Sequence, residues 1–520
     1  MATLTVPLHQ PHDFTLASDA AHDNPFMVAV HATFTHETGL AIENVPAFYA
    51  GGKRWIVRFS PTLPGAWNGR TRSDDASLND IPLDDVACVP NDNGRVHGLL
   101  GIDEARPRKL AWSDGTPFVL LGFECDWLFE YHRRDPKRAA THIDLLRERG
   151  FNYIVTNVYA HTGFSGPDPS GKDIRQVKPE YIYGPPEEYV FGGSNEQPDH
   201  SRLNTKFFEH FDAMMRALHE RGIVAHLMIQ VQNKAVTWPP RRSPEDDLFW
   251  RYVVARYQAF GNVVWDLSKE SYNLVKETGG FDYLLDRIEL IRRCDAYGHL
   301  VTAHDVLQGS MVRDTVVDDA CDIVSDQIHL GDCRRYNREA SRRLQRREKP
   351  YLNVEYGYEI GVEDLRTYTG HTTADWQQVL LWTWSVYAAG AYPCYYYNNT
   401  SWDLISFEPE PPGWKRYEYL HAFLCETPFN DMESANDLTQ RGMCLADPGK
   451  AYLVFLPEGG GTELDLSDVA DKSRMQCEWM AVYTGDRLST EAETNGFVTG
   501  LENPFESPDQ PCVVRVTVAS

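Results

Sequence analysis

The stretch Val263-Val264-Trp265-Asp266-Leu267-Ser268-Lys269-Glu270 shows the pattern that decides the fold of this chain. A short apolar run of strand length ends in charged residues, and amphipathic helical stretches lie on either side, at 245–260 and 281–297. Short apolar runs that alternate with helical stretches are typical of strands in an α/β sheet. The stretch therefore predicts one strand-then-helix unit.

The same unit recurs along the middle of the chain. Seven further apolar runs lie at 118–121, 153–155, 224–229, 300–303, 322–324, 351–354 and 390–392. Helical stretches fall between most of the runs, at 136–149, 205–221, 245–260, 281–297, 335–348 and 374–388. Eight such units predict an α/β fold of the (β/α)₈ TIM-barrel type. The first unit is the least regular, because Glu124-Cys125-Asp126-Trp127 interrupts it early.

Both flanks of this region show strand-like alternation instead. Arg54-Trp55-Ile56-Val57-Arg58-Phe59 is an example in the N-terminal part, and Ala451-Tyr452-Leu453-Val454-Phe455-Leu456 is one in the C-terminal part. We expect an N-terminal β-sandwich over residues 1–105, a catalytic barrel over 106–428 and a C-terminal β-sandwich over 429–520. A length of 520 residues suits a barrel with such additions.

Composition disfavours several classes of partner. A net charge of −25 repels phosphate backbones and anionic lipid, so we expect neither nucleic acid nor membrane as a partner. Mean hydropathy is −0.45 and no apolar run approaches about 18 residues. The ten cysteines are scattered and the first residues show no signal-peptide pattern, so we expect free thiols and a cytoplasmic location. Homo-oligomer formation stays open.

Polar and aromatic residues follow the predicted strands. Because barrel chemistry gathers at the carboxyl ends of strands, we expect these residues to line a substrate pocket. Their aromatic rings suit stacking on sugars, although ordinary core packing explains aromatic residues equally well. The candidate substrate-binding residues are Asp126, Trp127, His161, Gln230, Lys269, His304, Asp326, His329, Tyr356, Tyr397 and Trp402.

Two carboxylates have positions that suit catalysis. Glu270 ends the fourth predicted strand and Glu355 ends the seventh, so their side chains are expected to face each other across the barrel mouth. A retaining glycosidase needs two carboxyl groups about 5–5.5 Å apart. Either glutamate taken alone would more simply be a surface or salt-bridged residue, since the chain has 75 acidic residues. Asp266 is a weaker candidate, because it should lie within the strand.

Other chemistries have less support in the sequence. His304, Asp326 and His329 could in principle converge on a metal, but no HExxH-type spacing accompanies them. The chain lacks a GxSxG elbow, a P-loop and a GxGxxG motif after a strand. We therefore expect neither a metal nor another cofactor.

The chain resembles clan A of the retaining glycoside hydrolases, and more closely the apiosidase-like group of bacterial barrel glycosidases. The matching stretches are Trp55-Ile56-Val57-Arg58-Phe59-Ser60-Pro61 with Gly65-Ala66-Trp67, Trp265-Asp266-Leu267-Ser268-Lys269-Glu270, and Asn353-Val354-Glu355-Tyr356-Gly357-Tyr358. The resemblance implies Glu270 as general acid/base, Glu355 as nucleophile and flanking sandwiches, the C-terminal one often labelled collagen-binding-like.

One position departs from this pattern. Clan A enzymes usually carry an asparagine before the acid/base to bind the sugar 2-hydroxyl, and this chain carries Lys269. A lysine could donate a hydrogen bond there, but as a point charge. The leading hypothesis is a retaining, exo-acting β-glycosidase on a small or oligomeric glycan. A transglycosylase using the same carboxylates and a carbohydrate-binding barrel without catalysis are the alternatives.

Overall fold

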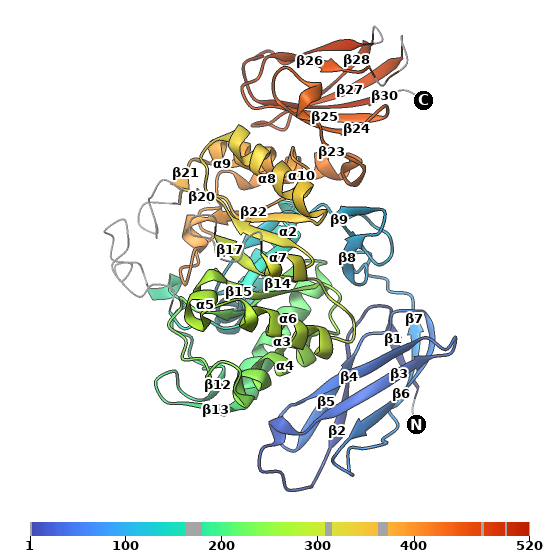
Figure 1. The fold of residues 1–520 in the computed structure, drawn as a ribbon, viewed down its shortest axis with the longest axis vertical. Coiled ribbons are helices and arrows are strands. Elements are labelled where there is room, and N and C mark those ends of the chain that lie inside the picture. The colour runs from blue at the N-terminus through green and yellow to red at the C-terminus, as the bar shows by residue number, and fades with distance from the viewer. Residues whose placement is uncertain are drawn as a thin grey trace.

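The computed structural model describes residues 3–162, 179–306, 315–361, 373–467, 469, 473–494 and 497–518. It consists of a sheet-rich N-terminal module, a central α/β part and a sheet-rich C-terminal module, with the α/β part in the middle (Figure 1). Part of the long segment 160–204, which the sequence predicts to be a wall or lid of the site, lies outside the described residues.

The N-terminal module is a seven-stranded sheet that folds over its own core. Its strands are β1 (Thr3–Pro7), β2 (His12–Ala17), β3 (Val30–His36), β4 (Ala41–Tyr49), β5 (Arg54–Phe59), β6 (Gly65–Ser73) and β7 (Asp85–Val89), in the order β1-β7-β6-β3-β4-β5-β2. Phe34 of β3 stacks on Phe59 of β5 with ring centroids 3.8 Å apart. The two halves of the sheet therefore face each other across apolar side chains, as in a sandwich.

The central sheet is parallel and closes almost completely into a barrel. Its strands are β10 (Gly122–Glu124), β11 (Tyr153–Asn157), β14 (Val224–Val231), β15 (Val263–Lys269), β16 (Val301–Thr302), β17 (His304–Val306), β18 (Val324–Gln327), β19 (Tyr351–Glu355) and β22 (Tyr392–Tyr397). Their order is β16-β15-β14-β11-β10-β22-β19-β18-β17. Only Ala303 separates β16 from β17, the two ends of this order, so they form one interrupted strand. The prediction of an α/β fold with a barrel-like sheet is confirmed.

The first barrel strand lies later than predicted. The run 118–121 is buried, but β10 begins only at Gly122. Phe118 N donates instead to Leu110 O of the hairpin formed by β8 (Leu100–Asp103) and β9 (Arg106–Trp112). The apolar run is therefore the buried connection from this hairpin into the barrel, and burial alone does not distinguish it from a strand.

Helices follow most of the barrel strands. They are α1 (Leu128–Arg134), α2 (Pro136–Glu148), α3 (Thr205–Glu220), α4 (Pro244–Tyr257), α5 (Tyr272–Thr278), α6 (Asp282–Cys294), α7 (Val316–Ala320), α8 (Cys333–Arg347), α9 (Trp376–Tyr387) and α10 (Trp414–Cys425). The six predicted helical stretches correspond to α2, α3, α4, α6, α8 and α9. The other helices were not predicted, and α1, α5 and α7 are too short for periodicity to be informative. Among the described residues, no helix combines the length and apolarity that crossing a membrane requires.

The C-terminal module packs two sheets face to face. Six strands form one sheet: β23 (Glu433–Ser434), β24 (Met443–Asp447), β25 (Ala451–Leu456), β30 (Cys512–Val518), β27 (Arg474–Ala481) and β28 (Arg487–Glu493). The other sheet pairs β26 (Gly461–Asp465) with β29 (Val498–Glu502). Leu464 and Leu501 of the small sheet share a buried cluster with Val454 and Val514 of the large one. This is the β-sandwich packing that the alternation predicted.

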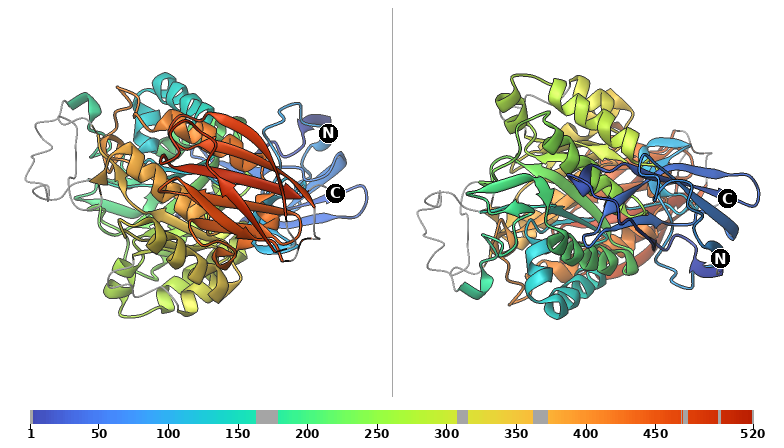
Figure 2. Two further views of the ribbon diagram at one scale, coloured as in Figure 1. Left: turned by 90° about the horizontal axis from the view of Figure 1, so that it is seen from above. Right: turned by 90° about the horizontal axis from the view of Figure 1, so that it is seen from below.

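Both modules are packed against the barrel. Phe48 of β4 and Phe455 of β25 belong to the same hydrophobic cluster as the barrel interior, and Phe455 stacks on Trp384 of α9 at 5.9 Å. Figure 2 shows that both modules lean toward the same side of the barrel, away from the side where β20 (Tyr358–Glu359) and β21 (Thr373–Ala374) lie.

Candidate active site

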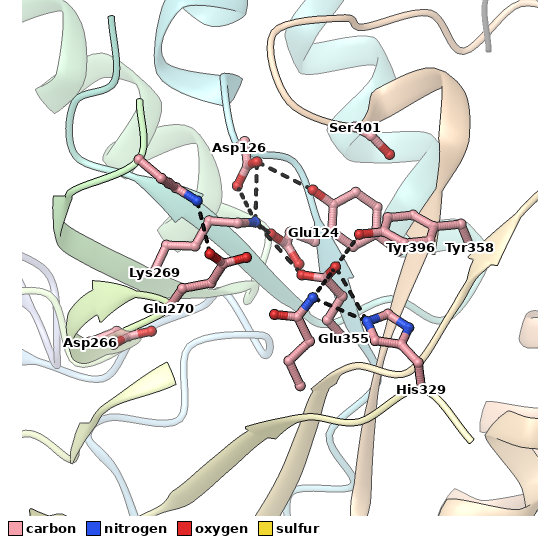
Figure 3. Close-up of polar contacts among 12 residues, drawn as sticks. Glu124, Asp126, Asp266, Lys269, Glu270, His329, Glu355, Tyr358, Tyr396 and Ser401 are labelled. Carbon is pink, nitrogen blue, oxygen red and sulfur yellow. Dashed lines mark hydrogen bonds and ion pairs between the residues drawn. The ribbon is translucent and has the colours of Figure 1, made fainter. Parts of the chain in front are cut away.

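Charged and aromatic side chains from several strand ends meet at the carboxyl-terminal side of the barrel (Figure 3). Parallel strands bring their carboxyl ends to one side of the sheet, so residues far apart in sequence become neighbours there. The side chains come from β10, β15, β18, β19, β20 and β22 and the turns that follow them: Glu124, Asp126, Lys269, Glu270, His329, Glu355, Tyr358 and Tyr396, with Gln327 hydrogen-bonded to Glu355.

Lys269 is at the centre of this cluster. Its Nζ donates to the Glu124 carboxyl group and lies 3.2 Å from Oδ1 and 3.3 Å from Oδ2 of Asp126. Glu355 Oε2 is 3.9 Å away, and these four side chains are at most 3% exposed. Burial lowers the pKa of Lys269, but Asp126, Glu124 and Glu355 together raise it well above its ordinary value. The ammonium group therefore stays charged.

Glu355 is held through one of its two carboxyl oxygens. Its Oε1 accepts hydrogen bonds from Gln327 Nε2 at 2.7 Å and from the Tyr358 hydroxyl, and His329 Nε2 lies 3.7 Å away. Within the part of the chain that the structure describes, Oε2 accepts no hydrogen bond. Burial raises the pKa of Glu355 to about 7, against the lowering effect of Lys269 and the Tyr358 hydrogen bond.

Glu270 is held in a similar way, but it is half-buried. Its Oε2 accepts from Asn233 Nδ2 at 2.9 Å, from the Tyr272 hydroxyl at 3.2 Å and from Asn273 Nδ2 at 3.2 Å. Its backbone has a φ of +48°, a left-handed conformation that non-glycine residues adopt at a cost of roughly 1–3 kcal/mol. The charge of Glu270 contributes to the raised pKa of Glu355, which places the two carboxylates in one electrostatic environment.

A partly buried tryptophan flanks the carboxylates. Trp402 has a φ of +56°, and its ring centroid is 6.5 Å from that of Tyr358. Lys234 Nζ lies 5.7 Å from the ring centroids of both Trp402 and Trp127. Because sugar rings stack on aromatic faces, Trp402 is suitably placed to bind one.

Comparison with known proteins identifies the family. The model of the Apiosidase-like catalytic domain matches residues 104–429, and a domain of unknown function, DUF5060, matches residues 5–74. The chain belongs to the Apiosidase-like family. None of the curated proteins matches the chain.

Solved structures share the fold of this Apiosidase-like protein. A protein from Bacteroides vulgatus ATCC 8482 that is named as a glycoside hydrolase has a TM-score of 0.80 at 19% identity, covering 99% of this chain and 100% of its own. A glycoside hydrolase family 5 protein from the same organism has a TM-score of 0.58 at 17% identity, covering 82% and 94%. The predictions that the chain is an enzyme and a glycoside hydrolase are confirmed.

Several residues that the sequence singled out lie in or beside the cluster of this Apiosidase-like enzyme. Glu270, Glu355, Asp126 and His329 are drawn together in Figure 3. Lys269 is there too. Its ammonium group, which was expected to bind a sugar hydroxyl, contacts carboxyl groups of the protein instead.

Four other predicted residues lie close by. His304 is fully buried, and burial together with the charge of Lys269 lowers its pKa well below the ordinary value. Trp127 is fully buried beside Lys234, and Trp402 lies across that lysine from it. His161 lies near Glu196, with Nε2 3.6 Å from Oε1. The roles of these residues in substrate binding stay predictions.

Gln230 and Asp326, which were expected to bind substrate, face the surrounding helices instead. Gln230 Nε2 donates to Asp246 of α4, and its Oε1 accepts from Tyr283 of α6. Asp326 forms an ion pair with Arg343 of α8. Successive side chains of a strand point to opposite faces, so a residue near a strand end has two directions open to it.

Two of the predicted tyrosines, Tyr356 and Tyr397, also face the helices. The Tyr356 hydroxyl is 2.6 Å from Thr383 Oγ1 of α9, and Tyr397 packs on Trp414 of α10 at 6.4 Å. Tyr358 and Tyr396 occupy the site instead: Tyr358 donates to Glu355, and the Tyr396 hydroxyl lies 3.2 Å from Asp126 Oδ2. Strand alternation around Glu355 and along Tyr395-Tyr396-Tyr397 is the signal that could have found them.

Other functional side chains also escaped the sequence analysis. Glu124 closes β10, which the sequence analysis placed too early, and Gln327 closes β18, whose end was placed at Val324. Asn233 and Lys234 lie beyond β14, where no periodic pattern marks them. Among the described residues, no group of three or more His, Cys, Asp or Glu side chains is arranged to hold a metal ion.

Proposed function

We propose that this enzyme is a retaining β-glycosidase in which Glu355 is the nucleophile and Glu270 the general acid/base. The single observation that carries the proposal is that both carboxylates meet at the mouth of one barrel, each held through one oxygen. A retaining mechanism requires two carboxyl groups with different roles at one anomeric carbon.

The environment of Glu355 suits nucleophilic attack. Gln327 and Tyr358 hold Oε1, so the side chain has a fixed orientation while the lone pairs of Oε2 accept no hydrogen bond among the described residues. In the first step Oε2 bonds to the anomeric carbon, the glycosidic C–O bond breaks, and Glu270 gives its proton to the leaving oxygen.

The environment of Glu270 suits proton transfer. It is half-buried, so a leaving group and then a water molecule can reach it, whereas Glu355 is 2% exposed. In the second step Glu270 takes a proton from water, the water oxygen bonds to the anomeric carbon, and the Glu355 carboxylate leaves. Two inversions return the original β configuration.

The segment that follows β11 supports exo action. Its described part contains η3 (Pro179–Tyr181), β12 (Phe191–Gly193) and β13 (Pro198–Leu203). Tyr183 N donates to Asp403 O, which lies just beyond the end of β22, and Asn195 Nδ2 donates to Ala235 O beyond β14. A segment tied beyond the ends of β22 and β14, the strands on either side of β10 and β11, forms a wall, which favours a pocket for a terminal sugar over an open cleft.

Kinetics of two variants test the roles. A working substrate is first identified with a panel of aryl β-glycosides. The panel contains pyranosides and furanosides, and it includes an apioside because of the family. Glu355→Gln should lower kcat roughly 10⁴-fold or more, because no covalent intermediate forms. Glu270→Ala should be slow on poor leaving groups and be rescued by azide on an activated aryl glycoside, with a β-glycosyl azide as product.

A matched control and a product analysis complete the test. Glu277 lies on α5, and its carboxylate pairs with Arg241. Glu277→Gln removes this charge and should leave turnover unchanged. Proton NMR of the first product should show the β anomer. Full turnover by Glu355→Gln, or a first product of inverted configuration, would remove the proposed mechanism.

A further inference from the structure

Lys269 stands where the resemblance implies an asparagine that binds substrate, and its contacts suit a different task. An ammonium group has three N–H donors. Glu124 and Asp126 take hydrogen bonds from Nζ, and the remaining side of Nζ faces Glu355 Oε2 at 3.9 Å. The anchoring carboxyl groups thus hold the ammonium group in place, with its charge beside Glu355 Oε2.

The anchoring carboxyl group of Glu124 is fully buried. Burial raises the pKa of Glu124 well above its ordinary value, and the neighbouring Asp126 and Glu355 charges raise it further against the effect of Lys269. Both carboxyl groups hold Nζ by hydrogen bonds, so its position beside Glu355 is fixed from two sides.

We propose that Lys269 is a positioning residue for Glu355: anchored by Glu124 and Asp126, its ammonium group keeps the candidate nucleophile ionised and oriented. This inference rests on the proposed role of Glu355. The other charged or titratable groups that face Glu355 are Glu270 on the turn after β15, Glu124 and Asp126 at β10, His304 on β17, His329 after β18, Tyr358 on β20 and Tyr396 on β22. Burial lowers the pKa of His304 well below its ordinary value, and Lys269 is the one lysine or arginine among these described groups.

The pH profile of the Lys269→Met variant tests the proposal. Without the ammonium group, Glu355 should hold its proton to higher pH. The acid limb of kcat/KM should therefore move upward by roughly one pH unit or more, with a loss of about tenfold or more below the limb and partial recovery above it. Lys269→Arg keeps the charge, and the limb should stay near its original position.

Lys109→Met is the matched control. Lys109 of β9 is also a buried lysine, with Nζ 3.0 Å from Gly390 O and 4.0 Å from the centroid of the Phe429 ring. Its loss should affect stability but leave the acid limb in place. A limb that moves equally in both variants would mean that loss of any buried lysine has this effect, and the proposal would fail.

A second variant covers the case in which Lys269→Met does not fold. The double variant Lys269→Met, Asp126→Asn removes one positive and one negative charge together, so the net charge of the buried cluster stays the same. Its acid limb should still move upward, because the cation nearest Oε2 is gone.

A measurement without substrate separates this proposal from the proposed function. In protein labelled with ¹³C at the glutamate carboxyl groups, the Glu355 signal is the one missing from Glu355→Gln. Its titration midpoint should rise in Lys269→Met, and an unchanged midpoint overturns the proposal. If Glu355→Gln retains activity, the catalytic assignment fails while the titration still reports the coupling. If Glu355→Gln is inactive and the midpoint is unchanged, only the role of Lys269 fails.

Discussion

At the residue scale, Glu355 experiences opposing effects at a single carboxyl group. Removal from water favours its neutral form, while the Tyr358 hydroxyl and Lys269 favour its ionised form. Burial has the larger effect, so the pKa of Glu355 rises to about 7. The same burial leaves Oε2 without a competing hydrogen bond among the described residues. A nucleophile at this position gains reactivity at the expense of being partly protonated near neutral pH.

This balance predicts the pH dependence of activity. Because the pKa of Glu355 is raised to about 7, the carboxyl group is protonated below that value and ionised above it. If Glu355 attacks as a carboxylate, kcat/KM should rise with pH through an acid limb near 7, as measured on an aryl glycoside in constant ionic strength. A limb near 4, the range of an ordinary glutamate, would contradict this prediction.

Tyr356 and Tyr358 follow Glu355 in the sequence, and only Tyr358 contacts its carboxyl group, so the two tyrosines make a matched pair of variants. Tyr358 donates to Glu355 Oε1, so Tyr358→Phe should lower kcat/KM about 10- to 100-fold, since hydrogen bonds to charged groups contribute about 1.5–3 kcal/mol. Tyr356 contacts Thr383 on the helix side, so Tyr356→Phe should leave kcat/KM unchanged. Steady-state kinetics of both variants measure the difference. An equal loss of kcat/KM in the two variants would contradict the assignment of Tyr358 to the site and of Tyr356 to the helix side.

At the element scale, strand alternation sorts the strand-end residues into two groups. Gln327 reaches Glu355 inside the barrel while its neighbour Asp326 reaches α8 outside, and Tyr396 and Tyr397 divide in the same way. Charged residues on the outer face are satisfied by helix side chains, so they tie helices to strands. At the ends of β18 and β22, one residue thus joins the site and its neighbour joins the packing of the barrel.

The end of α8 offers a test of element stability. Glu348 follows the helix with φ 49° and ψ 39°, and its N–H bonds to Leu344 O, the geometry that glycine favours. Glu348→Gly should raise stability by about 0.5–1 kcal/mol, because relief of strain exceeds the added freedom of the unfolded chain. Glu348→Ala is the control, since it removes the same exposed ion pair with Arg108 without relieving the backbone. Calorimetry should show a higher melting temperature for the glycine variant alone.

At the scale of the whole molecule, a buried ionic network joins the N-terminal module to the barrel. Arg58 of β5 and Arg256 of α4 both bind the Asp212 carboxylate of α3, and Arg58 also binds Asp13 of β2. Both guanidinium groups are at most 2% exposed. Because each arginine needs its carboxylate partner, the module and the barrel should unfold together.

Removal of Asp212 tests this coupling. Asp212→Ala should destabilise the protein by about 3–5 kcal/mol, since it leaves two buried cations short of a partner. Asp80→Ala breaks the exposed pair with Arg70 and should cost at most about 1 kcal/mol. Denaturant unfolding of both variants measures the difference, and similar costs would contradict the network's role.

The pH dependence of the same network has a definite sign. Burial raises the pKa of Asp212, but Arg58 and Arg256 lower it by a larger amount. The pKa of Asp212 in the folded protein therefore lies below the ordinary value. A lowered pKa in the folded state means that the stabilisation is present above the unfolded value of about 3.9. It is lost as pH falls through the lower folded-state pKa. Unfolding measured in this range should therefore show Asp212→Ala and the parent protein converging in stability at low pH.

The sequence by itself determined the succession of strands and helices. Apolar runs and helical periodicity are local properties, so they located six helices, most barrel strands and the strand-rich flanks. They also indicated Glu270 and Glu355, because a residue that ends a parallel strand must lie at the mouth whatever the partners are. What failed locally was the exact end of a strand, as at Glu124 and Gln327, since apolar runs continue past strand boundaries.

Only the tertiary structure decided which side each strand-end residue faces and what surrounds it. A shift of one residue exchanges inside for outside, so Tyr356 and Tyr358 could not be assigned before the register was known. The contacts of Lys269 with Glu124 and Asp126 join residues more than a hundred positions apart. Their charge states depend on burial and on mutual distance, and neither quantity exists until the barrel closes.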